Sequence, residues 1–391
     1  MNKPPKIVII TPFESRLTSR GTRLPVVADK LVEKGADVRY VTSDFSHAEK
    51  RHFTREEIAR VGASVPYRLD VIHVPAYRRH FGFRRILCHL VFSGRAYQLL
   101  RGHVEPCTTL VIPARPPELI AATARIKKLH QCRLHMDLSD LWPQSMEGRP
   151  PLLYAGFTAY CNAFQRRAVR QFDSFSHVSP CAMDWLRIYG IEKSSLFIPL
   201  GFDLARWGTE RPPKHFDPAH PRLVYVGTLT HHFDLSPLLL AMKATPHATL
   251  TIVGDGDREA QLRELARTHS IPNVVFKGRL PPEGVVLELD RAHIGVTPEV
   301  IRYGTLPNKV FDYVASETPI LVMGSCDTAI WVQSREYGWA IPLTENAARD
   351  WLTGDLLKSW NHAHDLLHRQ RQDYSKDTLY DRLIERLINP C

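Results

Sequence analysis

The chain has 391 residues, which is too long for one ordinary core and fits two domains of roughly 150 to 200 residues each. Hydrophobic residues make up 44% and charged residues 24% of the sequence, as in a soluble globular protein, and no apolar run approaches the roughly 20 residues that span a bilayer. Residues 1–204 carry 30 Lys plus Arg against 18 Asp plus Glu, a net +12, so the remainder carries 21 against 23, a net −2. The basic first half could attract an anionic lipid or a phosphorylated substrate. Nucleic acid is not expected as a partner, because no DNA-binding or RNA-binding signature accompanies the charge.

The opening MNKPPKIVII contains only a short apolar run, which predicts a first strand and not a secretory signal. The seven cysteines form no C-x-x-C pair, which argues against a disulfide framework or a structural zinc site. We therefore expect a cytoplasmic protein with reduced thiols.

Strand-like runs alternate with helical patterns such as 24–34 and 117–129. In the first half we expect strands at residues 6–11, 38–42, 71–74, 109–112, 133–136 and 175–178, and in the second half at 223–226, 249–253, 274–276, 294–297 and 320–322. This alternation predicts βα units and parallel sheets, so the fold class is α/β with two doubly wound, Rossmann-like domains.

A proline-rich stretch of poor periodicity, residues 205–222, predicts the connector between the domains. The boundaries we expect are 1–204 for the first domain and 205–372 for the second, with a C-terminal helix at about 373–391 that could pack back on the first domain. Ligands of open parallel sheets bind at the carboxyl ends of the strands, so we expect a cleft between facing sheet ends.

Residues 80–102 predict a basic amphipathic helix, with Phe83, Ile86, Leu87, Leu90 and Val91 on one face, and with Arg84, Arg85, Arg95, Arg101 and the preceding Arg79 around that face. Such a helix could lie in an anionic membrane interface. It could equally be an ordinary helix that packs on the core and exposes a charged face.

The segment VTPEVIRYGTLPNKVFDYVASETPILVM, residues 296–323, predicts a strand, a loop, a helix and a second strand. Pro307 suits a first helical turn, so Lys309 lies in that turn. There the helix dipole already favours negative charge, and an added ammonium is unfavourable unless an anion is present. Lys309 is therefore a candidate phosphate ligand. The alternative is a solvated residue at a helix start.

Seven segments together resemble nucleotide-sugar glycosyltransferases of the B-type fold, and most closely the family 4 enzymes of bacterial polysaccharide assembly and the glucuronosyltransferase of xanthan synthesis. They are HMDLSDLWPQS (135–145), HVSP (177–180), IPLGFD (198–203), YVGTL (225–229), IVGDGD (252–257), VVFKGRLP (274–281) and PNKVFDY…PIL (307–321). The resemblance implies two domains that face each other across a cleft. It also implies a donor in the second domain, usually uridine-linked, and an acceptor in the first.

The resemblance assigns roles to individual residues. CRLHMDLSD carries a strand to a polar end with Asp137 and Asp140, and the resemblance selects Asp140 as the catalytic base. Arg16, Arg20 and Gly21 follow the first strand on the acceptor side. The donor-binding residues that the resemblance implies are Gly227, Thr228, Leu229, Arg279, Glu299, Asn308, Lys309 and Asp312.

Two departures from the family pattern matter for the donor. Pro307, eight positions after Glu299, replaces the usual second Glu, so that Asp312 would hold the ribose instead. No Arg and Lys pair follows Gly227, so neutralisation of the diphosphate would depend mainly on Lys309.

We therefore expect a metal-independent hexosyl or glycuronosyl transferase that uses a nucleotide sugar, most simply a UDP-sugar. Its acceptor would be a saccharide or a lipid diphosphate-linked saccharide in bacterial surface polysaccharide biosynthesis. The nucleotide sugar is a substrate, so no cofactor and no metal is expected. The protein would be cytoplasmic, with peripheral contact to the inner face of the membrane through residues 80–102. The alternatives are a sugar-nucleotide epimerase of the same fold and a non-catalytic peripheral membrane scaffold.

Overall fold

The structure, a computed structural model, describes residues 3–18, 23–78, 82–144, 150–300, 306–354 and 356–389. The chain divides into two compact units, which are described one at a time. Unit 1 comprises Met1–Ile198 and Tyr380–Cys391, and unit 2 comprises Pro199–Leu379. Helix α15 (Lys376–Ile388) contributes its last residues to unit 1.

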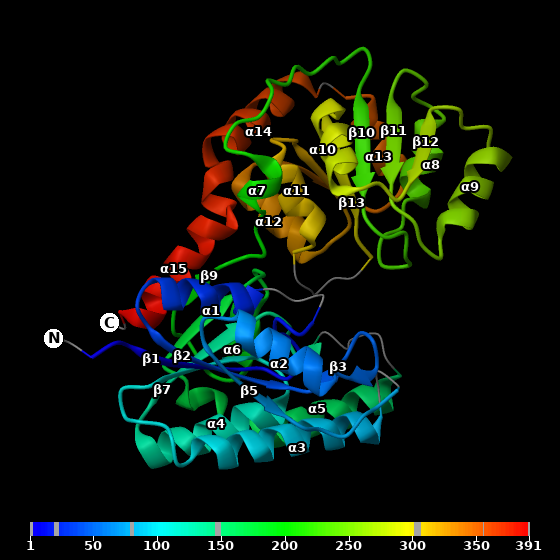
Figure 1. The fold of residues 1–391 in the computed structure, drawn as a ribbon. Coiled ribbons are helices and arrows are strands. Elements are labelled where there is room, and N and C mark those ends of the chain that lie inside the picture. The colour runs from blue at the N-terminus through cyan, green and yellow to red at the C-terminus, as the bar shows by residue number, and fades with distance from the viewer. Residues whose placement is uncertain are drawn as a thin grey trace. The chain divides into compact units, whose positions relative to one another are not determined.

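The described part of unit 1 contains a seven-stranded parallel sheet in the order β5-β2-β1-β6-β7-β8-β9 (Figure 1). Its strands are β1 (Lys6–Ile10), β2 (Asp37–Ser43), β5 (Arg68–Ile72), β6 (Thr109–Pro113), β7 (Arg133–Leu138), β8 (Ser174–His177) and β9 (Ser195–Phe197). In register, Ile9 of β1 lies opposite Tyr40 on one side and Val111 on the other. The topological switch point is therefore at β1, between β2 and β6. A short antiparallel pair, β3 (Phe45–Ser46) and β4 (Arg51–His52), follows β2.

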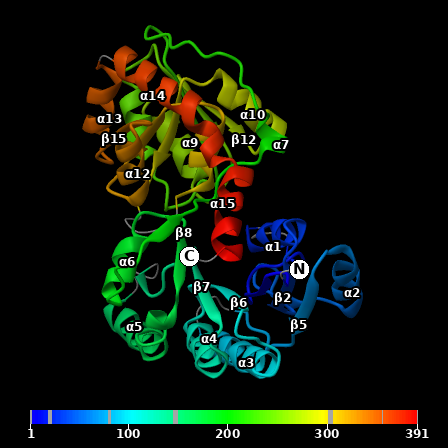
Figure 2. The ribbon, with the colours of Figure 1, turned by 90° about the vertical axis from the view of Figure 1, so that its left-hand side faces the viewer.

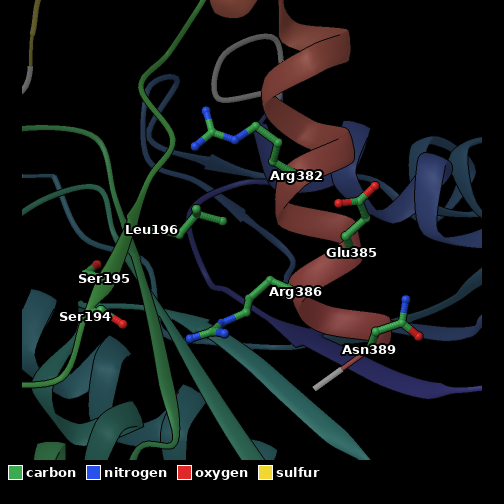
Figure 3. A pocket seen from close by; sticks show the side chains of 7 residues that line it. All are labelled: Ser194, Ser195, Leu196, Arg382, Glu385, Arg386 and Asn389. Carbon is green, nitrogen blue, oxygen red and sulfur yellow. The ribbon is translucent and has the colours of Figure 1, made fainter. Parts of the chain in front are cut away.

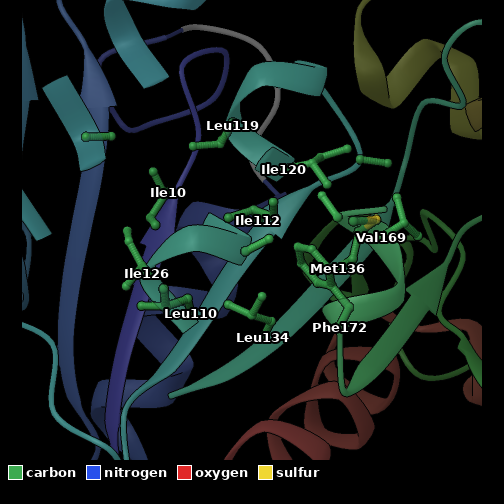
Figure 4. Packing of buried hydrophobic residues seen from close by; sticks show 14 of the residues in the cluster. Ile10, Leu110, Ile112, Leu119, Ile120, Ile126, Leu134, Met136, Val169 and Phe172 are labelled. Atoms are coloured by element: carbon green, nitrogen blue, oxygen red, sulfur yellow. The ribbon is translucent and has the colours of Figure 1, made fainter. Parts of the chain in front are cut away.

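The helices of unit 1 cover both faces of the sheet, which explains why β1 and β6 are almost continuously apolar. They are α1 (Arg23–Glu33), α2 (Arg55–Ser64), α3 (Phe83–Leu100), α4 (Pro117–His130), α5 (Pro151–Gln165), the 3₁₀ turn η2 (Val169–Gln171) and α6 (Ala182–Ile188). Figures 1 and 2 show α3, α4 and α5 along one face and α1 on the other. Strand side chains pack there against α4 and η2 (Figure 4): Ile10, Leu110, Ile112, Leu134 and Met136 contact the layer of Leu119, Ile120, Ile126, Val169 and Phe172.

The described part of unit 2 contains a six-stranded parallel sheet in the order β12-β11-β10-β13-β14-β15. Its strands are β10 (Arg222–Val226), β11 (Thr249–Val253), β12 (Val274–Gly278), β13 (Ile294–Pro298), β14 (Ile320–Met323) and β15 (Gly338–Ile341). The switch point lies at β10, which pairs with β11 on one side and β13 on the other.

The helices of unit 2 are α7 (Leu204–Trp207), α8 (Ser236–Met242), α9 (Glu259–Thr268), α10 (Pro282–Arg291), α11 (Asn308–Ala315), α12 (Asp327–Arg335), α13 (Glu345–Leu352), α14 (Leu357–Gln370) and the 3₁₀ turn η3 (Arg371–Tyr374). Helix α8 packs against α9 and α13, while α11 contacts β13 and α12 contacts β14 and β15. No helix in the described ranges is both long enough and apolar enough to cross a bilayer.

Two doubly wound α/β units are therefore present, as the alternation of strand and helix patterns predicts. The strand expected at residues 71–74 begins earlier, since β5 runs over Arg68–Ile72. The sequence gives no warning of β9 or β15, because both are short and only half-buried and lack a clear period.

Candidate functional site

The first candidate site forms at the switch point of unit 2, where the carboxyl ends of two strands diverge. Gly227 directly follows β10, and Glu299 directly follows β13. Helix α11, which returns from β13, begins at Asn308 with Pro307 as its N-cap. In open α/β sheets this crevice is where ligands bind.

Lys309 lies in the first turn of α11, as the sequence predicts, and its side chain is 7% exposed. The apolar side of the helix holds it in place, because Val310, Phe311 and Val314 are buried beside it. The ammonium nitrogen lies 3.4 Å from the ring centre of Phe233 and 4.0 Å from that of Tyr225. These aromatic faces attract the cation but accept no conventional hydrogen bond.

The ammonium of Lys309 has no hydrogen-bond partner among the described residues. Burial lowers its pKa to about 7, and the charge of Glu299 only partly opposes this effect. Lys214 provides the contrast within the same unit. Burial also lowers its pKa to about 7, but its Nζ donates to the Leu289 carbonyl at 2.6 Å, the Ala292 carbonyl at 3.3 Å and the Thr318 hydroxyl at 2.5 Å. Lys214 is a satisfied structural lysine, whereas Lys309 lacks acceptors.

Gly227 allows the backbone to lie against the lysine. A Cβ at this position would meet Lys309 Cε at 3.1 Å and Nζ at 3.2 Å, and the backbone φ is +143°. The Gly227 N–H donates to the Val253 carbonyl and the Leu229 N–H to the Asp255 carbonyl, each at 2.9 Å. These two N–H groups are therefore already hydrogen-bonded within the protein. Thr228 between them is exposed, and within the described ranges its N–H and hydroxyl have no partner.

The GDGD segment, residues 254–257, packs against the loop that follows β10. A Cβ on Gly254 would lie 1.9 Å from the Gly227 carbonyl oxygen, so only glycine permits the contact. Arg279 is exposed and pairs with Asp255 at 3.0 Å. Its guanidinium, which the resemblance implies for donor binding, is thus engaged by a neighbouring carboxylate in this structure.

Two of the predicted donor residues are carboxylates, one directly after β13 and one in α11. Glu299 is half-buried, accepts hydrogen bonds from the hydroxyls of Thr297 at 3.0 Å and Thr328 at 3.1 Å, and burial raises its pKa. Asp312, one turn after Lys309, pairs with Arg206 at 3.4 Å, and burial raises its pKa against the opposing charge of Arg206. Asn308 is exposed at the start of α11. Of the predicted donor residues, Gly227, Thr228 and Leu229 follow β10, Glu299 follows β13, and Asn308, Lys309 and Asp312 lie in α11, while Arg279 follows β12.

Unit 1 places Asp140 at the corresponding carboxyl edge, just after β7. Its Oδ2 lies 3.0 Å from Nε of Arg115, and both side chains are 29% exposed. The neighbouring Asp137 is buried, pairs with Arg23 at 3.0 Å and accepts a 2.6 Å hydrogen bond from Ser176. Of the two aspartates, only Asp140 is accessible to an acceptor.

Of the three residues expected on the acceptor side, the structure describes only Arg16. Arg16 pairs with Asp29 and is partly exposed. Arg20 and Gly21 lie outside the described residues.

Within the described ranges, one set of side chains could hold a metal ion. Potential ligand atoms of Asp44, His52 and His73, near the β3–β4 pair of unit 1, all lie within 4.8 Å of one another. His73 Nδ1 already pairs with Asp44 at 2.5 Å, and His52 Nε2 bonds the Val74 carbonyl at 2.8 Å. The set belongs to a different unit from Lys309, and metal-independent transfer remains a prediction.

A pocket of about 620 Å³ in unit 1 lies at the start of β9 and not at a strand's carboxyl end (Figure 3). Arg382 and Arg386 of α15 line it opposite Ser194, Ser195 and Leu196. Because ligands of doubly wound sheets bind at the opposite edge, we do not assign this pocket to the candidate site.

The aromatic rings of Tyr225 and Phe233 are the components of the site that sequence reasoning misses. Tyr225 reads as an ordinary strand residue and Phe233 as part of a loop, so neither carries a local signal. Their place beside Lys309 depends on how β10 and the segment after it pack against α11.

Comparison with known proteins agrees with this geometry. Residues 220–351 match the family model of glycosyl transferases group 1. No curated protein matches the sequence. Among solved structures, the lipopolysaccharide outer core galactosyltransferase WaaB aligns at TM-score 0.68 and 12% identity, covering 99% of this chain and 100% of the other.

Two further structures align over nearly the whole chain. HepE of Anabaena in complex with UDP gives a TM-score of 0.65 at 11% identity, covering 98% of this chain and 99% of the other. WaaG, a glycosyltransferase involved in lipopolysaccharide biosynthesis, gives 0.59 at 14% identity, covering 98% and 100%. This chain therefore shares the two-domain fold of these glycosyltransferase structures, and its residues 220–351 match the family model of glycosyl transferases group 1.

Proposed function

We propose that the protein is a glycosyltransferase that transfers a sugar from a nucleotide-diphosphate sugar, with UDP as the nucleotide, to a saccharide or lipid-linked saccharide acceptor. The observation that carries this proposal is the buried Lys309 ammonium, which has aromatic neighbours but no described hydrogen-bond acceptor. A diphosphate supplies the missing acceptors and the missing negative charge together.

The donor end of the reaction follows from the residues of unit 2. As the bond between the sugar and the diphosphate breaks, negative charge grows on the leaving oxygen. The Lys309 ammonium, the N-terminal end of α11 and the N–H and hydroxyl of Thr228, which have no partner within the described ranges, are the groups that would stabilise it. A solved relative of the same fold, HepE, has been crystallised with UDP, which supports UDP as the nucleotide proposed here.

The acceptor end uses Asp140. In the proposed reaction its carboxylate accepts the proton of the attacking hydroxyl while the acceptor oxygen bonds to the anomeric carbon. The neighbouring Arg115 guanidinium lies 3.0 Å from this carboxylate and would hold it in place as an ion pair. No step of this scheme needs a metal ion or a cofactor.

We also propose that unit 1 contacts an anionic membrane surface at the inner face of the cytoplasmic membrane. On α3, Phe83 is 76% exposed and Leu87 and Leu90 are about 40% exposed, so part of the apolar face that the sequence predicts is open to solvent. Helix α5 has no charged residue from Pro151 to Gln165, and its Leu152 is 89% exposed. Exposed apolar helix faces beside arginines are typical of peripheral membrane proteins.

The proposal is tested by a thermal-shift screen over nucleotides and nucleotide sugars, followed by a transfer assay that detects released UDP. We expect one class of nucleotide sugar to raise the melting temperature by mass action, and UDP release to depend on an added acceptor. Conversion of the donor to an epimer without acceptor would instead show a sugar-nucleotide epimerase. Vesicle binding with no nucleotide binding would show a membrane scaffold.

A further inference from the structure

Three side chains that bind metals in other proteins meet beside the β3–β4 pair of unit 1. Asp44 directly follows β2, His52 ends β4 and His73 directly follows β5. One potential ligand atom from each residue lies within 4.8 Å of the other two. We call these three residues the Asp44 cluster. They come from three separate segments, so no local sequence motif marks them.

Backbone hydrogen bonds hold these three segments together independently of the side chains. The Asp44 N–H donates to the Ile72 carbonyl at 3.0 Å, and the Asp44 carbonyl accepts from the Phe53 N–H at 2.8 Å. The residue before His73 and the residue after His52 are thus both tied to Asp44. The two imidazoles therefore need only side-chain movement to reach a shared ion.

The side chains lie at distances that a metal ion would bridge. His73 Nδ1 is 2.5 Å from Asp44 Oδ2, and His52 Nε2 is 3.8 Å from Asp44 Oδ1. Zinc bonds to nitrogen and oxygen are about 2.0 to 2.2 Å long, so the ligand atoms of a tetrahedral ion lie roughly 3.3 to 3.5 Å apart. An ion would replace the proton that His73 shares with Asp44. The His73 side chain is 69% exposed, so it can move back to admit the ion.

The remaining contacts orient the ligands. The Val74 N–H donates to Asp44 Oδ1 at 3.1 Å, and His52 Nε2 bonds the Val74 carbonyl at 2.8 Å. Hydrogen bonds of this kind orient the carboxylates and imidazoles that bind metals. His52 Nδ1 has no partner among the described residues, so His52 can bind an ion through Nδ1 and keep its bond to Val74, or exchange that bond for one through Nε2. The His52 ring also packs against Phe45, with ring centres 5.3 Å apart.

The chemistry of the Asp44 cluster selects the class of ion. Two imidazoles and one carboxylate suit zinc and similar transition metals, whereas magnesium and calcium prefer oxygen ligands. The Arg95 guanidinium donates to the His73 carbonyl at 2.5 Å, which fixes the backbone there but places one positive charge near the site. Asp44 is the ligand that offsets this charge. Three protein ligands leave a fourth position for water.

We propose that Asp44, His52 and His73 bind a zinc-like divalent transition-metal ion. The ion would link the end of β2, the β3–β4 pair and the end of β5, which is the strand at one end of the described sheet. It would thereby stabilise unit 1, because a metal that binds only the folded site adds to the free energy of folding. In the sheet, β1 and β6 separate β2 from β7, which carries the chain to Asp140. The ion therefore takes no part in sugar transfer, and the inference does not depend on the proposed function.

The binding test is a calorimetric titration with zinc, made on protein without an affinity tag and with its accessible thiols alkylated so that they do not bind the ion. We expect one equivalent of zinc to bind. Asp44→Asn, His52→Gln and His73→Gln should each weaken this binding by about tenfold or more. Circular dichroism confirms that each variant is folded, and His73→Gln changes an exposed side chain. An absence of zinc binding, or an affinity that two of the three substitutions leave unchanged, overturns the proposal.

His362→Gln is the matched control. His362 also pairs with a carboxylate, that of Glu336 at 3.0 Å, but has no third ligand beside it among the described residues. This variant should bind zinc like the parent protein. A loss of zinc binding as large as that of His73→Gln would show that exposed histidines in general, and not the Asp44 cluster, bind the ion.

Two further measurements test the class of ion and its role. Magnesium in the same titration should not bind, and an affinity equal to that of zinc would contradict a site built on imidazoles. Zinc at about 100 times its dissociation constant should raise the melting temperature of the parent protein by mass action, but not that of His73→Gln. Acceptor-dependent UDP release should be equal in the parent and in His73→Gln, and its loss in the variant would overturn the structural role of the ion. Absence of UDP release from both would remove the proposed function and leave the metal site standing.

Discussion

Replacing Lys309 with Met should stabilise the free protein while impairing its use of the donor. The ordinary lysine pKa is 10.5 and burial lowers that of Lys309 to about 7. Between these values the unfolded chain holds a proton that the folded protein lacks, so the free energy of unfolding rises with pH across this window. Below pH 7 the folded protein bears the full free-energy cost of burying the charged ammonium, which amounts to roughly 5 kcal/mol at 1.4 kcal/mol per pKa unit.

Methionine removes this penalty and keeps an apolar contact with the rings of Tyr225 and Phe233. The lost attraction between the ammonium and those rings offsets about 1 to 2 kcal/mol. We therefore expect Lys309→Met to gain about 3 to 4 kcal/mol at pH 6, and the gain to shrink as the pH approaches 10. Lys214→Met is the control. It relieves the same cost of burying a charged lysine, since burial lowers the pKa of Lys214 to about 7 as well, but it also removes three hydrogen bonds and leaves two carbonyls unpaired. Its gain in stability at pH 6 should therefore be smaller than that of Lys309→Met by about 2 kcal/mol or more.

Denaturant unfolding at pH 6, 7.5 and 9 measures the stability change, and calorimetry with UDP measures binding. Loss of a charge-assisted phosphate contact should weaken UDP about 10- to 100-fold in Lys309→Met. UDP affinity should be unchanged in folded Lys214→Met. Destabilisation by Lys309→Met at pH 6, or unchanged affinity for UDP, would refute the reasoning that this ammonium is held without acceptors for a phosphate.

Three further predictions concern catalysis, pH and the membrane. Asp140→Asn should reduce the rate of sugar transfer at least a hundredfold in a UDP-release assay, while its affinity for UDP stays at the wild-type value. An unchanged turnover rate removes Asp140 from the mechanism. UDP-glucose is a diester with no ionisation near neutral pH, so the pH dependence of its binding should come from Lys309, which must be protonated to bind it. Its affinity should be constant below pH 7 and fall by up to tenfold per pH unit above it. A flat calorimetric profile from pH 6 to 9 contradicts this prediction. Changing both Leu152 and Leu153 to Glu should abolish sedimentation of the protein with anionic vesicles. The control Ile188→Glu, also at an exposed residue, should still sediment with them. Equal vesicle binding by the two variants excludes α5 from the membrane contact.

The sequence predicts the layers of this fold well because continuous apolar strands and amphipathic helices alternate along it. β1 and β6 are buried on both faces and read as almost unbroken apolar runs, whereas β7 alternates Leu134, Met136 and Leu138 with polar residues. Edge elements such as β15 escape detection, since their side chains are half-exposed and their pattern is weak. The short β3–β4 pair likewise has too few residues to show a period.

For the candidate site, the sequence predicts single residues better than their partners. The position of Lys309 follows from Pro307 and the apolar period of α11, both of which are local. That Asp312 meets Arg206 and Arg279 meets Asp255 depends on how separate segments pack, which no local pattern encodes.

The most direct measurement is a side-chain NMR titration of Lys309, assigned by comparison with Lys309→Met, in the free protein and with saturating UDP. The free ammonium should titrate near pH 7. With UDP bound, its titration should move upward by two or more pH units, because the diphosphate stabilises the charged form. A midpoint near the ordinary lysine value in the free protein, or one that UDP leaves unchanged, would contradict a diphosphate site at the start of α11.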